Sequence, residues 1–167
     1  LSTKTSFVIA IPILIFFFPL SLSYLWGGGW ISSLEHSLDF AGAALVHWHV
    51  GSVALVIGGV LTWYRKTHPS QPLPSLSVWV MLTGGLLYFL GVVGLTVGST
   101  LTAKPDFVAS VLQCVLLAAG IAGLVSLVAW GLVRRGSWAK FLVAGILAGA
   151  VSISGAADYY TFTKSLV

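Results

Sequence analysis

Five long apolar segments separated by short polar breaks dominate the hydropathy pattern of the chain. They contain no Lys, Arg or Glu, and they cover residues 7–25, 39–64, 76–99, 107–133 and 141–157. About 20 apolar residues suffice for a helix to cross a bilayer, and backbone groups in lipid must be satisfied within the crossing segment. The pattern therefore predicts an all-α integral membrane protein with about five transmembrane helices, forming a single polytopic membrane domain over residues 1–167.

The charged residues in the breaks sort by side when the chain is threaded through a membrane five times. One side then holds six of the eight basic residues, namely Lys4, Arg65, Lys66, Arg134, Arg135 and Lys140. The other side holds Lys104, Lys164 and all four acids, Glu35, Asp39, Asp106 and Asp158. Lys and Arg concentrate in cytoplasmic loops. We therefore expect a cytoplasmic N-terminus and an external C-terminus, in a bacterial inner membrane or a photosynthetic membrane.

The composition excludes several classes of protein. The chain is 57% hydrophobic and only 7% charged, whereas soluble domains carry about 25% charged residues. Its few cations are scattered, so no basic face for nucleic acid exists. No nucleophile–base pair, phosphate-binding loop or paired carboxylate is visible, so we do not expect an enzyme. The partners expected are the lipid bilayer, with bound lipids, and other membrane subunits or further copies of the chain.

Small residues recur at the spacing that lets membrane helices pack closely. Gly94 and Gly98 form one GxxxG motif, and Gly145 and Gly149 form another. Helix association in lipid depends on such close approach, because lipid supplies no hydrophobic drive. We expect both motifs to lie at helix–helix contacts.

Three ionisable residues lie within the second apolar segment, where each is a functional candidate because its burial in lipid is costly. Asp39 precedes the apolar run and is expected to cap the helix. His47 shares a helical stripe with Ala43 and Gly51, so it should point into the bundle. His49 is rotated by about 200° from His47 on an ideal helix and should point elsewhere, to lipid or to a partner subunit.

The residues alone leave three roles open for His47. Its imidazole could line a pore for a small polar solute. It, or His49, could ligate a haem iron or the magnesium of a chlorophyll-type pigment. It could also be a buried histidine that bonds to a neighbouring helix and has no functional role.

Several motifs, taken in order, resemble the ammonium transporter (Amt/Mep/Rh) family. They are Trp26-Gly-Gly-Gly-Trp30, Leu38-Asp39-Phe40-Ala41-Gly42 with His47 following, Val97-Gly98-Ser99, and the segment 144–157. The resemblance extends over nearly the whole chain and implies helices four to eight of a family member with eleven. The fold it implies is part of an ammonium-transporter bundle.

The resemblance also implies roles for single residues. Trp26 and Ser99 match residues of the family's outer cation-recruitment site. Asp39 matches the aspartate that supports this vestibule from below, and His47 matches the first histidine of the twin-histidine pore. The second pore histidine has no counterpart in this chain, and Leu95 and Val92 stand at two aromatic positions of the family.

These matches and departures lead to three hypotheses for function. The preserved scaffold with an incomplete pore favours a structural or accessory subunit of a larger photosynthetic or respiratory membrane complex. The first alternative is transport of ammonium or ammonia by an oligomer. The second alternative is a subunit that binds haem or chlorophyll through His47 or His49.

Overall fold

The computed structural model describes residues 3–33, 39–68, 77–134 and 136–159, and the regular structure within these ranges is helical. The first span comprises α1 (Thr3–Pro12), the π-helix η1 (Ile13–Phe17) and α2 (Phe18–Leu25). The second comprises the π-helix η2 (Ala43–Trp48) and α3 (His49–Thr67). The remaining helices are α4 (Val78–Gly98), α5 (Pro105–Val133) and α6 (Trp138–Ser154).

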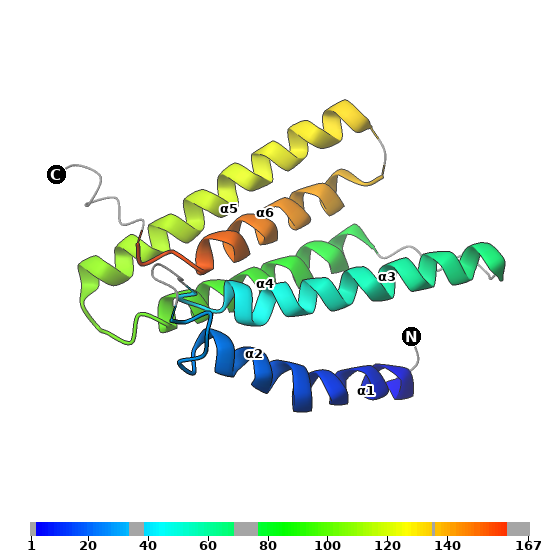
Figure 1. Cartoon of the computed structure of the whole chain (residues 1–167). Coiled ribbons are helices and arrows are strands. Elements are labelled where there is room, and N and C mark those ends of the chain that lie inside the picture. The colour runs from blue at the N-terminus through cyan, green and yellow to red at the C-terminus, as the bar shows by residue number, and fades with distance from the viewer. Residues whose placement is uncertain (1–2, 34–38, 69–76, 135, 160–167) are drawn as a thin grey trace.

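Successive spans run in alternating directions, and α1 and the C-terminal end of α6 lie at opposite ends of the bundle (Figure 1). Among the described residues, four helical segments are long and apolar enough to cross a membrane, and α6 is a shorter apolar helix of 17 residues. The prediction of an all-α membrane bundle is confirmed. Of the residues on which the predicted orientation depends, Glu35, Arg135 and Lys164 lie outside the described part of the chain.

Several helix boundaries differ from the sequence prediction by a few residues. The second span becomes helical at Ala43 rather than at residue 39, because Gly42 has a left-handed backbone (φ 80°) that ends the preceding turn. This conformation suits glycine, which lacks a β-carbon. The last helix covers Trp138–Ser154 instead of 141–157, and turns follow it up to Tyr159.

The π-helical segment η1 interrupts the first span, and the π-helical segment η2 begins the second span. In the first span, η1 directly follows Pro12, a residue that has no backbone N–H and disturbs the helical ladder around it. In the second span, η2 carries His47. Isolated π-turns occur frequently at functional sites, so η2 is a place to look for one.

The packed core lies among α4, α5 and α6. Val92, Val115, Ala119 and Ala150 form its buried cluster. A β-carbon built on Gly149 would lie 2.7 Å from the Cβ of Ala122, so a side chain there would force the two helices apart. The prediction that the 145/149 motif mediates helix contact is confirmed.

The first two spans lie outside this core. Phe7–Leu25 contains no buried residue, and α3 is exposed along most of its length. A β-carbon on Gly58, Gly94 or Gly98 would meet no described atom within 4 Å. The expected contact at the 94/98 motif is therefore wrong for the described part of the chain. These surfaces face lipid or a further protein helix.

Candidate functional site

The carboxylate of Asp39 caps the start of the second span. Its Oδ1 accepts a hydrogen bond from the Ala44 N–H at 3.0 Å, and its Oδ2 accepts one from the Leu45 N–H at 2.9 Å. A helix leaves its first N–H groups without partners, and an anion there also matches the helix dipole. The predicted capping role of Asp39 is confirmed, although the residue lies outside the helix that it caps.

Backbone hydrogen bonds join the same segment to the end of α6. The Phe40 N–H donates to the Gly155 carbonyl at 2.9 Å, and the Ala41 N–H donates to the Ser154 carbonyl at 3.0 Å. A β-carbon on Gly155 would lie 2.9 Å from the Cβ of Ala43. The entrance to η2 is therefore held against the fifth span by bonds between residues more than 100 positions apart.

Trp26 reaches the same segment from the first span. Its indole Nε1–H donates to the backbone carbonyl of Asp39 at 3.0 Å, while the side chain remains 53% exposed. The structure thus brings together two of the predicted site residues. It leaves the aromatic face of Trp26 accessible to a solute at the end of the bundle where the first span ends.

His47 projects from η2 with its Nε2 buried and with no hydrogen-bond partner in the described part of the chain. This burial agrees with the prediction that the ring points into the bundle. An unpartnered buried polar atom costs roughly 1–3 kcal/mol. Such an atom is notable because buried polar atoms in proteins are nearly always bonded.

His49 does not point to lipid or to a partner subunit as predicted. Its Nε2 lies 2.6 Å from the Ser21 hydroxyl of α2, and its Nδ1 lies 3.3 Å from the Ala44 carbonyl. The prediction is wrong because the helix face that carries His49 lies against the first span of the same chain rather than against lipid. The serine within an apolar span was the signal for this contact.

Ser99 follows the last residue of α4 and donates its hydroxyl hydrogen to the Leu95 carbonyl at 2.9 Å. The C-terminal ends of α2 and α4 lie at the same end of the bundle (Figure 1). Within the described ranges, no hydrogen bond connects Ser99 with Trp26, Asp39 or His47. Among the described residues, hydrogen bonds therefore connect Trp26 with Asp39 but not with Ser99.

The comparisons with known proteins cover almost the entire chain. The model of the Ammonium Transporter Family matches residues 2–167. The chain belongs to the ammonium transporter family. It is 34% identical to an ammonium transporter of Bacillus subtilis over 145 residues, which is 86% of this chain and 34% of that protein.

Two further ammonium transporters show the same partial coverage. Amt1 of Archaeoglobus fulgidus is 30% identical, with 86% of this chain and 36% of that protein covered. Ammonium transporter 1 of Dictyostelium discoideum is 27% identical, with coverage of 92% and 33%. The chain thus spans about a third of the length of the curated relatives it matches. No solved structure matches the chain.

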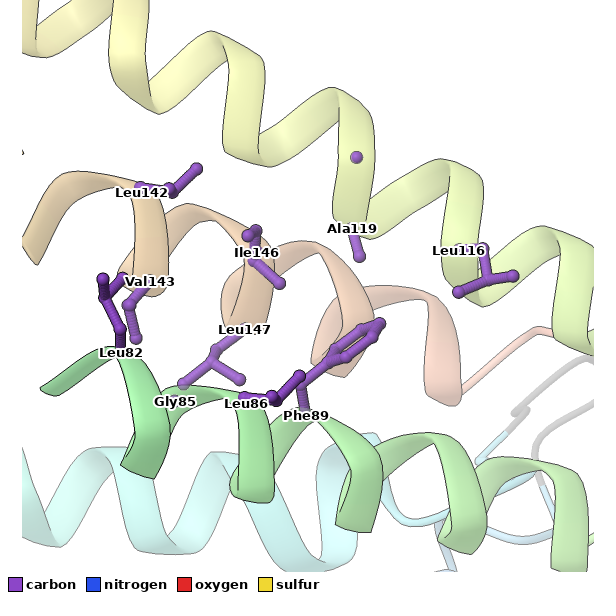
Figure 2. A pocket seen from close by; sticks show the side chains of 11 residues that line it. Leu82, Gly85, Leu86, Phe89, Leu116, Ala119, Leu142, Val143, Ile146 and Leu147 are labelled. Atoms are coloured by element: carbon purple, nitrogen blue, oxygen red, sulfur yellow. The ribbon is translucent and has the colours of Figure 1, made fainter. Parts of the chain in front are cut away.

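An apolar cavity in this ammonium transporter family member lies away from His47. It has a volume of about 350 Å³ and is enclosed by α4, α5 and α6 (Figure 2). Its lining consists of aliphatic residues, glycines and Phe89, among them Leu82, Leu116 and Ile146. Because no polar side chain lines it, the cavity offers a cation no replacement for its hydration.

The described residues hold no group of three or more His, Cys, Asp or Glu that could bind a metal ion. The predicted haem or chlorophyll site at His47 or His49 stays a prediction that nothing here tests. For His49, both ring nitrogens already lie within hydrogen-bonding distance of protein atoms. The buried Nε2 of His47 is the imidazole nitrogen that remains available to a ligand.

Proposed function

We propose that the chain takes part in the transport of ammonium or ammonia, with His47 at the site where the solute passes. This was the first alternative from the sequence. The matched relatives, named as ammonium transporters, support it better than the accessory-subunit hypothesis. They give no support to a place in a photosynthetic or respiratory complex.

The unpartnered Nε2 of His47 is the observation that carries the proposal. A neutral imidazole nitrogen can either accept or donate one hydrogen bond. Ammonia has both an N–H donor and a lone pair, so it can satisfy this nitrogen in either tautomer. The unmade hydrogen bond thus creates a preference for a small polar solute in an otherwise apolar span.

The outer end of the proposed path has groups suited to a cation. The half-exposed ring of Trp26 can attract ammonium through its negative face. The carboxylate of Asp39 is engaged with the N–H groups of Ala44 and Leu45. In this proposal Asp39 therefore holds the site together and adds negative potential, rather than binding the cation directly.

The exposed face of the second span suggests how a pore forms beside His47. The helix α3 is exposed along most of its length. A β-carbon built on its Gly51 or Gly58 would meet no described atom within 4 Å. Small residues permit close helix packing. We propose that this face meets further protein helices, supplied by additional copies of the chain, so that transport is the property of an oligomer.

Ammonium-dependent pH change in proteoliposomes tests the proposal. Proteoliposomes are prepared at equal protein density with wild type, His47→Ala or His68→Ala. An ammonium gradient is then imposed across their membranes. His68 is a suitable control because it lies just beyond α3, where its ring stacks on Tyr64 at 4.4 Å. We expect flux in wild type and His68→Ala and a loss of about 10-fold or more in His47→Ala, the size of one strong polar contact. Flux no higher than in empty liposomes, or an unaffected His47→Ala, would reject it.

A further inference from the structure

A hydrogen bond between two side chains connects the first and second spans. The Ser21 hydroxyl of α2 and the Nε2 of His49 lie 2.6 Å apart, and both groups are partly buried. Because the first span lies outside the packed core, few other contacts hold it beside η2. Polar bonds of this type contribute to helix association within lipid.

The partners of His49 define which of its nitrogens carries the hydrogen. Nδ1 faces the Ala44 carbonyl, which can only accept, so the hydrogen of a neutral ring belongs on Nδ1. Nε2 then accepts from the Ser21 hydroxyl at 2.6 Å, in place of the bond that this hydroxyl can also donate to the Phe17 carbonyl at 2.9 Å. In this tautomer one imidazole bonds to α2 on one side and to η2 on the other.

Both backbone groups of Ala44 face side chains. Its N–H donates to Asp39 Oδ1 at 3.0 Å, and its carbonyl faces His49 Nδ1 at 3.3 Å. His47 lies in η2 between Ala44 and His49, which is the first residue of α3. The segment that carries His47 is therefore bonded at two places, to Asp39 through Ala44 and to Ser21 through His49.

We propose that His49 is a positioning residue for transport at His47, acting through its bond to Ser21. The expected effect on transport rests on the proposed function, whereas the effect of Ser21 on the two histidine rings does not. The Ser21 hydroxyl fixes the His49 ring, which holds the π-turn and keeps the His47 Nε2 directed into the bundle. No solute contacts His49 in this role.

Nitrogen-15 spectra of histidine-labelled protein in nanodiscs test the structural part. The matched variants are Ser21→Ala, which removes the hydroxyl, and Ser21→Thr, which keeps it. The resonances of His47 are assigned as those that disappear in His47→Ala, and the resonances of His49 as those that disappear in His49→Phe. We expect Ser21→Ala to shift the His49 and His47 resonances and Ser21→Thr to preserve both. Unchanged His47 resonances in Ser21→Ala would overturn the inference.

Flux through the same variants tests the consequence for transport. We expect Ser21→Ala and His49→Phe each to lower ammonium flux by about 2- to 10-fold, the range for loss of one hydrogen bond. The double variant should be no worse than either, while Ser21→Thr should resemble wild type. Additive losses, or equal losses in Ser21→Thr and Ser21→Ala, would contradict positioning. If wild type gives no flux, the proposed function fails, whereas the His47 resonances still decide whether Ser21 positions that ring.

Discussion

The indole Nε1–H of Trp26 donates a hydrogen bond to the backbone carbonyl of Asp39 at 3.0 Å. This bond connects the end of the first span to the residue that caps the second. The carbonyl of Asp39 thus contacts the first span, while its carboxylate holds the start of η2. Two residues that the family resemblance assigns to the outer end of the path are in direct contact.

Replacing Trp26 with Phe is expected to lower stability slightly, because the ring remains but the donor is lost. The side chain is 53% exposed, so water can replace the indole, and the cost should be about 0.5 kcal/mol. Thermal unfolding in one detergent, followed by circular dichroism, measures this change. Trp30→Phe is the matched control, since that ring instead lies edge-on to Tyr24 at 6.2 Å. An equal loss in the control would mean that the bond to Asp39 contributes nothing.

Replacing Asp39 is expected to have a graded effect on stability. Asn keeps one acceptor but loses the charge, so Asp39→Asn should cost about 1 kcal/mol. Asp39→Ala leaves both the Ala44 and Leu45 N–H groups without this partner and should cost roughly 2–3 kcal/mol. The unfolding midpoints of the three proteins should therefore fall in the order Asp, Asn, Ala. Asp106→Asn at the start of α5 is a control, because Asp106 lies in the first turn of that helix but makes no capping hydrogen bond among the described residues. Equal midpoints for Asp39→Ala and wild type would show that Asp39 is not a cap.

Adding one methyl group at Gly149 is expected to separate α5 from α6. The new β-carbon would lie 2.7 Å from the Cβ of Ala122 and also against the Ala118 carbonyl. Overpacking of this kind costs about 1–3 kcal/mol. At Gly131 on α5 a β-carbon meets no described atom within 4 Å, so Gly131→Ala should be neutral or stabilise the helix by up to about 1 kcal/mol. Denaturant unfolding of the two variants provides the comparison, and a Gly149→Ala protein as stable as Gly131→Ala would contradict the packing.

Much of the fold follows from the sequence, because the lipid environment imposes simple rules. Apolar length predicted each of the five helical segments, and the position of Asp39 before an apolar run predicted its capping role. The close approach at Gly145 and Gly149 followed from their spacing of four residues. In each case the relevant interactions are local or lie along one helix face.

The parts that could not be predicted depend on an irregular turn and on distant partners. Nothing local in Ala43–Trp48 signals a π-helix, and hydropathy does not show that the first span lies beside His49, so the direction predicted for that ring was wrong. The bonds from Phe40 and Ala41 to Gly155 and Ser154 are between backbone groups, which any residue possesses. The contact between Trp26 and Asp39 also depends on how two spans are arranged in space, which the hydropathy pattern does not predict.

The Ala44 peptide has an electrostatic consequence for the whole segment. The peptide group that contains the Ala44 carbonyl also contains the Leu45 N–H, so the Asp39 carboxylate at that N–H and an imidazole N–H at that carbonyl both reinforce its dipole. Hydrogen bonds in such a chain polarise one another in a low-dielectric medium. A change of charge at Asp39 is therefore transmitted through a single amide group to the His49 ring and onward to Ser21. The cap of the second span and its contact with the first span are thus electrically coupled across one peptide group.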